Sequence, residues 1–273
     1  MNSILAIEMV IVLTILSLLS LKLRILDMNG TILSVVIGAI VYATIGRVGI
    51  SLLIVFVVVA GLFTKMGYDR KSLIGAAEPR KGLRGWKNVA GNGLVAATAA
   101  IAYALFPQYS EALLGGFIGA VAAVFADTMS TEVGLLQKGE PRLIIGFKKV
   151  NPGTPGGISL LGYLGALLSS LILILAYLPL GSTNPLNPAT TTLVAVIAGL
   201  IGTTVDSIVG QLLQGLYRCE ECGKIVEHSR HCGRGAKLFK GYRVIDNHVV
   251  NLICSLSGAI VGAAITLLFY STA

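Results

Sequence analysis

The chain has 273 residues, of which 55% are hydrophobic and only 12% are charged. A soluble domain has about a quarter of its residues charged, so this composition excludes a soluble fold and predicts a polytopic membrane protein. The formal charge of +8 would suggest nucleic-acid binding in a soluble chain, but here basic connections on one side of a membrane explain it, and we expect no nucleic-acid partner.

A helix needs ~20 apolar residues to span a bilayer, and somewhat fewer where the bilayer is thin, and eight apolar runs meet this condition. They cover residues 3–21, 31–45, 48–65, 89–106, 112–127, 156–178, 189–213 and 249–270. We therefore predict an all-α fold: a polytopic helical bundle embedded in the lipid bilayer, forming a single domain over residues 1–273. Its oligomeric state, including a homo-oligomer, is left open.

The basic residues gather in alternate connections between these runs. The first, third, fifth and seventh connections are rich in Lys and Arg, whereas the even-numbered connections contain only Arg47. By the positive-inside rule, the odd connections lie in the cytoplasm and both termini lie outside, in a multi-pass protein of the cell membrane. The polar clusters described below then fall at the cytoplasmic face, which favours a one-sided site over a conduction path.

Four acidic residues lie at or near the inner ends of apolar runs: Asp127, Glu132, Asp206 and Asp246. A charge at bilayer depth costs on the order of 2.5–3.5 kcal/mol even on a lenient insertion scale, so such groups usually face a functional cavity. Mg²⁺ binds carboxylates together with substrate phosphates. The competing interpretation is that each acid neutralises a nearby Lys or Arg. Their common depth favours one catalytic, magnesium-binding site that contains all four.

Amide and hydroxyl side chains accompany the acids. Asn88 and Asn92 are four residues apart at a predicted helix start, and so are Asn247 and Asn251, which places each pair on one helical face. These amides can bind metal, phosphate or ribose. The hydroxyls that lie beside the acids in sequence are Thr128, Ser130 and Ser207.

A glycine-rich segment, residues 151–157, precedes the sixth run. Glycines let backbone N–H groups approach an anion, and the following helix start adds a positive dipole end. The segment lacks the Lys-Ser/Thr ending of a Walker A loop, and ordinary turns are the alternative interpretation. We expect phosphate binding by the following residues: Lys148, Lys149, Gly153, Thr154, Gly156 and Gly157.

The third connection, residues 65–87, is strongly basic. It can act as a topology anchor against anionic lipids, or bind a triphosphate, and the sequence does not separate these roles. The candidates for triphosphate binding are Arg80, Lys81, Arg84 and Lys87.

The seventh connection contains an insertion, residues 216–245, with the pattern of a zinc knuckle. Cys-x2-Cys-Gly begins at Cys219, and a tetrahedral Cys₃His group is a common closed structural zinc site. Cytoplasmic thiols argue against disulfides. The predicted Zn²⁺ ligands are Cys219, Cys222, His228 and Cys232, with His231 as the alternative histidine. Cys254 lies inside the last run and is assigned to packing.

The order of these motifs resembles one known family. The motifs are Asn92-Gly93, Asp127-Thr128-x-Ser130-x-Glu132-x-Gly134, Pro152-Gly153-Thr154-x-Gly156-Gly157, Asp206-Ser207 and Asp246-Asn247-x3-Asn251. This set is similar to the integral membrane proteins that include plant phytyl-phosphate kinase and vertebrate transmembrane protein 19. The resemblance implies transfer of a phosphoryl group from a nucleoside triphosphate, CTP above all, to an isoprenyl monophosphate. The Cys/His insertion is not general to the family, and Pro155 stands where the family often has Asp or Asn.

Chemistry and resemblance agree on a CTP-dependent, Mg²⁺-dependent isoprenyl-phosphate kinase that makes the lipid diphosphate. A nucleotidyltransferase that makes a CDP-lipid would need the same acids and metal. A transporter or lipid scramblase is the alternative from a different class, and it would place ionisable groups near the membrane midplane.

Overall fold

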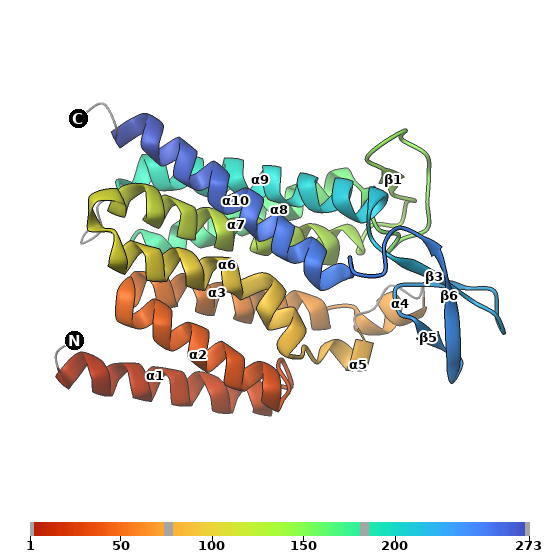
Figure 1. Cartoon of the computed structure of the whole chain (residues 1–273), viewed down its shortest axis with the longest axis horizontal. Helices are drawn as coiled ribbons and strands as arrows, with labels where there is room; N and C mark the ends of the chain where they lie inside the picture. Colours follow the sequence, from red (N-terminus) through yellow and green to blue (C-terminus); the bar gives the residue numbers. More distant parts are fainter. Residues whose placement is uncertain (1–2, 74–78, 181–185, 271–273) are drawn as a thin grey trace.

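The computed structural model describes residues 3–73, 79–180 and 186–270, and it is a bundle of apolar helices with a small β-sheet at one end (Figure 1). Seven described helices are long and apolar enough to cross a membrane, and the shorter α2 has 17 residues. The long helices are α1 Ser3–Lys22, α3 Arg47–Lys65, α6 Trp86–Leu105, α7 Ser110–Gly134, α8 Leu160–Tyr177, α9 Pro188–Leu212 and α10 Asn247–Tyr270, with α2 at Met28–Thr44.

These helices confirm the predicted fold class, and they follow the eight predicted runs within a few residues at most ends. The sixth run was predicted to begin at residue 156. The helix begins at Leu160 instead, because Gly157–Ile158 forms a strand and the Ser159 hydroxyl caps the helix by accepting from Gly162 N at 3.0 Å.

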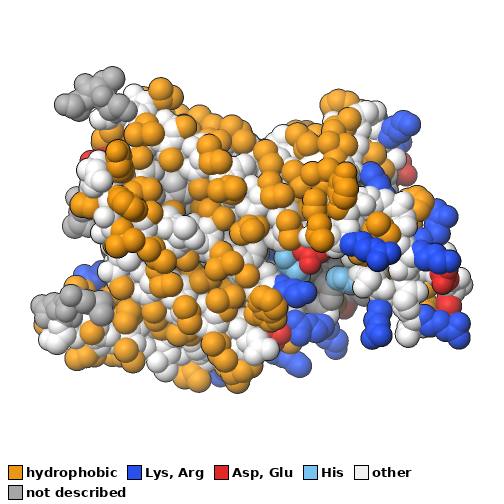
Figure 2. All heavy atoms as spheres, viewed as in Figure 1, with side chains coloured by type: hydrophobic (Ala, Val, Ile, Leu, Met, Phe, Trp, Pro, Cys, Tyr) orange, Lys and Arg blue, Asp and Glu red, His pale blue; other side chains and the backbone are white. Residues whose placement is uncertain are grey.

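The two ends of the bundle differ in character. The start of α1 and the end of α10 lie at one end, whereas the short helices α4 (Tyr68–Leu73) and α5 (Pro79–Gly82) and the strands lie at the other (Figure 1). Lys and Arg side chains gather at the strand-bearing end, while the flanks of the bundle are hydrophobic (Figure 2). The alternation of basic connections in the sequence therefore corresponds to one basic end of the molecule.

Helix α7 lies at the centre of the bundle, and glycines let α10 cross it closely. A Cβ atom added at Gly119 would lie 2.2 Å from the carbonyl oxygen of Gly258, and one at Gly262 would lie 2.2 Å from that of Gly115. No side chain fits at such distances, so all four crossing positions need glycine. Small residues at a membrane helix interface allow this approach.

Two small antiparallel sheets lie at the basic end. The first pairs β1 (Arg142–Leu143) with β2 (Gly157–Ile158) and closes the loop between α7 and α8. The second is the insertion between α9 and α10, with strand order β4-β3-β6-β5. Its strands are β3 Leu216–Cys219, β4 Ile225–Val226, β5 Arg230–His231 and β6 Arg234–Lys240.

Candidate functional site

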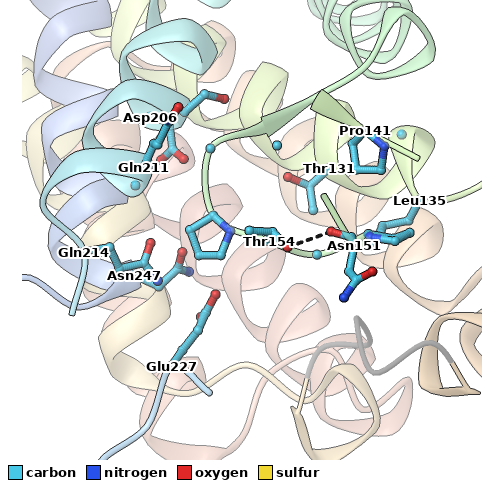
Figure 3. A pocket seen from close by; sticks show the side chains of 18 of the residues that line it. Thr131, Leu135, Pro141, Asn151, Thr154, Asp206, Gln211, Gln214, Glu227 and Asn247 are labelled. Atoms are coloured by element: carbon cyan, nitrogen blue, oxygen red, sulfur yellow. Dashed lines mark hydrogen bonds between the residues drawn. The ribbon is translucent and has the colours of Figure 1, made fainter. Parts of the chain in front are cut away.

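A pocket of about 1190 Å³ lies at the basic end of the bundle, between the ends of α6, α7, α9 and α10, the loop 139–157 and the insertion (Figure 3). It brings together most of the predicted site residues although they lie far apart in sequence. These are Asn88, Asn92, Asp127, Thr128, Ser130, Glu132, Gly153, Thr154, Gly156, Gly157, Asp206, Ser207, Asn247 and Asn251. The expected residues that do not line it are Arg80, Lys81, Lys87, Lys148, Lys149 and Asp246.

Asp127 on α7 and Asp206 on α9 form the acidic part of the pocket. Their carboxyl groups are close enough to interact with each other, and Asp127 Oδ1 accepts from the Thr203 hydroxyl at 3.4 Å. Asp206 Oδ2 is buried and has no hydrogen-bond partner among the described residues. Two carboxylates in such contact repel each other unless a proton or a cation lies between them. The donor set fits Mg²⁺, which takes one or two carboxylates and completes its shell with water and phosphate oxygens.

Glu132 lines the same pocket, but it has a partner that the sequence did not indicate. Its Oε2 accepts from Lys71 Nζ at 2.5 Å, and Lys71 Nζ also donates to the carbonyl oxygen of Phe63 at 2.8 Å. The two side chains are only 7% and 2% exposed. The charge of Glu132 is thus already balanced inside the protein, which corresponds to the alternative interpretation of the acids as partners of basic residues.

Asp246 caps the start of α10. Its Oδ1 accepts from the backbone N–H groups of His248 and Val249 at 3.0 and 3.1 Å. This geometry is that of a helix N-cap, which satisfies orphan N–H groups in the first turn. The expectation that all four acids line one site is therefore corrected: three line the pocket, and Asp246 caps the helix beside it.

Three of the four paired amides are joined by hydrogen bonds across two helices. Asn92 Nδ2 donates to Asn88 Oδ1 at 3.0 Å along α6, and Asn251 Nδ2 from α10 donates to Asn92 Oδ1 at 3.1 Å. All three line the pocket, and they are at most 9% exposed. The chain of hydrogen bonds fixes the relative position of α6 and α10 at the pocket.

The cations of the pocket differ from those expected. Lys148 is exposed, and Lys149 pairs with Glu140 at 3.3 Å on the surface, so the prediction that these two lysines face the site is wrong. The cations that line the pocket are Arg84, which was one of the expected candidates, and Lys224 and Lys240, which were not.

The four candidate cations of the basic connection at residues 65–87 do not lie together: Arg84 lines the pocket, whereas Arg80, Lys81 and Lys87 do not. Arg80 pairs with Asp27 at 2.9 Å, away from the pocket. Arg84 lines the pocket, where its guanidinium donates to Thr64 Oγ1 at 3.0 Å and its buried Nε has no partner among the described residues. Arg84 is therefore the basic-loop residue placed to meet a ligand.

The glycine-rich segment forms two consecutive turns. Thr154 N donates to Asn151 O at 3.1 Å, and Gly157 N donates to Thr154 O at 2.9 Å. Gly153 and Gly156 have φ of 81° and 80°, the left-handed conformation of the third turn residue in a type II turn. The prolines before these glycines suit the second position, which gives Pro155 a role. Two amides of the predicted phosphate loop are thus occupied by the turns themselves.

Gln211 of α9 holds this loop in place. Its Oε1 accepts from Ile145 N at 2.9 Å and its Nε2 donates to Ile145 O at 3.0 Å, as a neighbouring strand would. Gln211 lines the pocket together with Thr154 and Asn151, whose hydrogen bond is drawn in Figure 3. A single Gln inside a helical run does not indicate such a contact, so this role of Gln211 could not be predicted from the sequence.

The insertion contributes a wall of the pocket and a separate Cys/His group. Glu227 and Asn247 point into the pocket in Figure 3, and His228 also lines it. The group that could hold a metal contains His231, the alternative histidine, in place of His228 (its members are Cys219, Cys222, His231 and Cys232). The N–H of Cys222, followed by the His231 ring, lowers the pKa of the Cys219 thiol to about 6.

The chain is similar in sequence to integral membrane proteins over most of its length. The family model described as integral membrane protein DUF92 matches residues 11–259. Protein PGR of Arabidopsis thaliana is 30% identical over 90% of this chain and 91% of its own length. An uncharacterised membrane protein of Methanocaldococcus jannaschii is 30% identical over 94% of this chain and 92% of its own. The chloroplastic protein VTE6 of Arabidopsis thaliana is 28% identical over 86% of this chain and 64% of its own. No solved structure matches the chain.

Proposed function

The chain belongs to the integral membrane protein family DUF92, to which its motifs pointed, and we propose that it is a CTP-dependent lipid kinase. It would transfer the γ-phosphoryl group to an isoprenyl monophosphate and make the lipid diphosphate. The resemblance to phytyl-phosphate kinase supports an isoprenyl monophosphate as the acceptor of the phosphoryl group. The pocket's chemistry supports the class of reaction.

The observation that carries the proposal is the Asp127–Asp206 pair in a pocket that is also lined by cationic side chains. Phosphoryl transfer depends on positioning and on stabilisation of negative charge. Asp127 and Asp206 would hold Mg²⁺, since Asp206 Oδ2 has no hydrogen-bond partner within the described part of the chain. Bound there, Mg²⁺ would neutralise charge on the transferred phosphoryl group.

The chain's other groups would position the two substrates. Arg84, with its unpartnered Nε, and the ammonium groups of Lys224 and Lys240 would bind phosphate oxygens of the nucleotide. The acceptor is already an anion at neutral pH, so the reaction needs no strong general base. Asn247 and Asn251 line the same pocket and can donate to phosphate or ribose oxygens.

The position of the pocket suits a lipid substrate. It lies at the end of the bundle, where a lipid headgroup and a soluble nucleotide can meet while the isoprenyl chain stays in the bilayer. The Lys and Arg side chains at this end support a cytoplasmic pocket, with the start of α1 and the end of α10 outside, by the positive-inside rule (Figure 2).

The test uses the purified protein in detergent with an isoprenyl monophosphate, Mg²⁺ and CTP labelled at either the α- or the γ-phosphate. A kinase places γ-label, and no α-label, in a lipid diphosphate on thin-layer chromatography. Lipid that carries α-label, with γ-label released in free diphosphate, would instead identify a nucleotidyltransferase. Absence of nucleotide turnover with isoprenyl chains of several lengths would overturn the proposal in favour of a transporter or scramblase.

A further inference from the structure

We propose that the insertion binds one Zn²⁺ and that this ion orders the wall of the pocket formed by residues 223–228. The ligands would be Cys219, Cys222, His231 and Cys232. The proposal does not rest on the proposed function, because it concerns how the pocket wall is held rather than what reacts there.

The four side chains have the spacing of a tetrahedral site. Their ligand atoms all lie within 4.8 Å of one another. His231 Nδ1 is 3.4 Å from Cys222 Sγ and 3.2 Å from Cys232 Sγ. Zn–S bonds of ~2.3 Å and Zn–N bonds of ~2.0 Å at a tetrahedral angle set these atoms ~3.5 Å apart, so one ion fits between them with little movement.

The backbone is already folded around this group. Cys219 N donates to Lys224 O at 2.9 Å and Gly223 N donates to Cys219 O at 3.0 Å, which closes a tight turn with Gly223 at φ 71°. Cys232 has a φ of 52°, in the left-handed region that non-glycine residues occupy only when the surroundings hold them there. A bound metal would provide that restraint.

The sheet of the insertion has little else to stabilise it. Strands β4 and β5 have two residues each, and most residues of the longer strand β6 are exposed. Small units without a hydrophobic core of their own need a metal or disulfides to fold, and a structural zinc supplies folding free energy directly.

The metal group and the pocket wall are parts of one loop. Cys222 precedes and His231 follows the segment 223–228, in which Lys224, Glu227 and His228 line the pocket. Metal bound at both ends would close this loop and reduce the number of conformations open to it. Loss of the metal should therefore loosen this wall of the pocket while the helices stay folded.

The experiment compares two histidine variants of the full-length protein in detergent. Elemental mass spectrometry should find about one zinc per chain in wild type and in His228→Ala, and at least tenfold less in His231→Ala, because only His231 reaches the thiols. Cys254→Ser, which alters the cysteine buried in α10, is the matched control for a cysteine outside the group and should keep its zinc. No zinc in wild type, or zinc lost from His228→Ala and kept in His231→Ala, would overturn the assignment.

Hydrogen exchange tests the link to the pocket. A strong chelator should raise amide exchange at least tenfold in residues 219–240 and leave α7 and α9 unchanged. Unchanged exchange at 223–228 after the zinc has been removed would overturn the claim that the ion orders the wall. Neither measurement uses the enzymatic reaction, so failure of the proposed function and failure of this inference are separable.

Discussion

The buried ion pair between Lys71 and Glu132 allows a test of how the basic connection is attached to the bundle. Lys71 is on α4, outside the bundle helices, yet its side chain is only 2% exposed and reaches Glu132 on α7. Lys71→Met keeps a long apolar side chain but removes the ammonium group. It leaves the Glu132 carboxylate without its cation and also removes the hydrogen bond to Phe63 O.

The expected loss is large because breaking a buried pair leaves an uncompensated charge. Such a loss is typically about 3–5 kcal/mol, and we expect the lower part of this range because Glu132 borders the pocket, where water can reach it. For a chain of this size, each kcal/mol lowers Tm by ~2–4 °C, so Lys71→Met should melt ~6–12 °C below wild type. Adding Glu132→Leu should recover most of the loss, since apolar replacement of both partners is often neutral.

Thermal melting in detergent, followed by far-ultraviolet circular dichroism, measures this effect. The matched control is Arg47→Met, which breaks the exposed pair between Arg47 and Glu8, whose side chains are 59% and 31% exposed. Exposed pairs contribute at most ~1 kcal/mol, so the control should melt within a few degrees of wild type. A Lys71→Met protein that melts like this control, or a double variant less stable than Lys71→Met, would refute the reasoning.

Three further predictions concern the pocket loop and the caps of two helices. Gln211→Ala removes both hydrogen bonds to the loop and should raise protease cleavage within residues 139–157 at least tenfold, without changing the helical circular dichroism. Asp246→Asn should leave Tm within about 2 °C of wild type, because Asn is an equally good N-cap. The Gly30 N–H, and then Arg80, lower the pKa of Asp27, so its stabilising charge is present above the ordinary value of 3.8 and is lost as the pH falls through the lower folded value. Wild type should therefore have a higher Tm than Asp27→Asn at neutral pH, and this difference should disappear in acid. A difference in Tm that does not change with pH would contradict this.

The helices could be predicted because a membrane span is recognised from one continuous stretch of apolar residues. Most of the apolar runs are long enough to cross a bilayer, and the glycines that let α7 and α10 approach lie at regular spacing within their runs. The convergence of Asp127, Asp206 and the paired amides also followed from their common depth. Burial cost and topology together restrict where such groups can lie.

The errors come from contacts that sequence spacing does not determine. Lys71 and Glu132 are 61 residues apart, and nothing local pairs them. Lys148 and Lys149 adjoin the glycine-rich loop in sequence, but the direction in which the loop turns places them outside. The N-cap role of Asp246 could have been predicted, since Asp is a common N-cap residue directly before a helical run.

The most direct test of the account is γ-label transfer from CTP to an isoprenyl monophosphate by wild type, Asp206→Asn and Glu140→Gln. Asn has nearly the size of Asp but lacks the charge that would hold Mg²⁺, and Glu140 is an exposed acid paired with Lys149 outside the pocket. We predict label in the lipid diphosphate for wild type and Glu140→Gln, and turnover at least ~100-fold lower for Asp206→Asn with unchanged melting. Transfer by Asp206→Asn at the wild-type rate would contradict the assignment of the Asp127–Asp206 pair as the centre of the site.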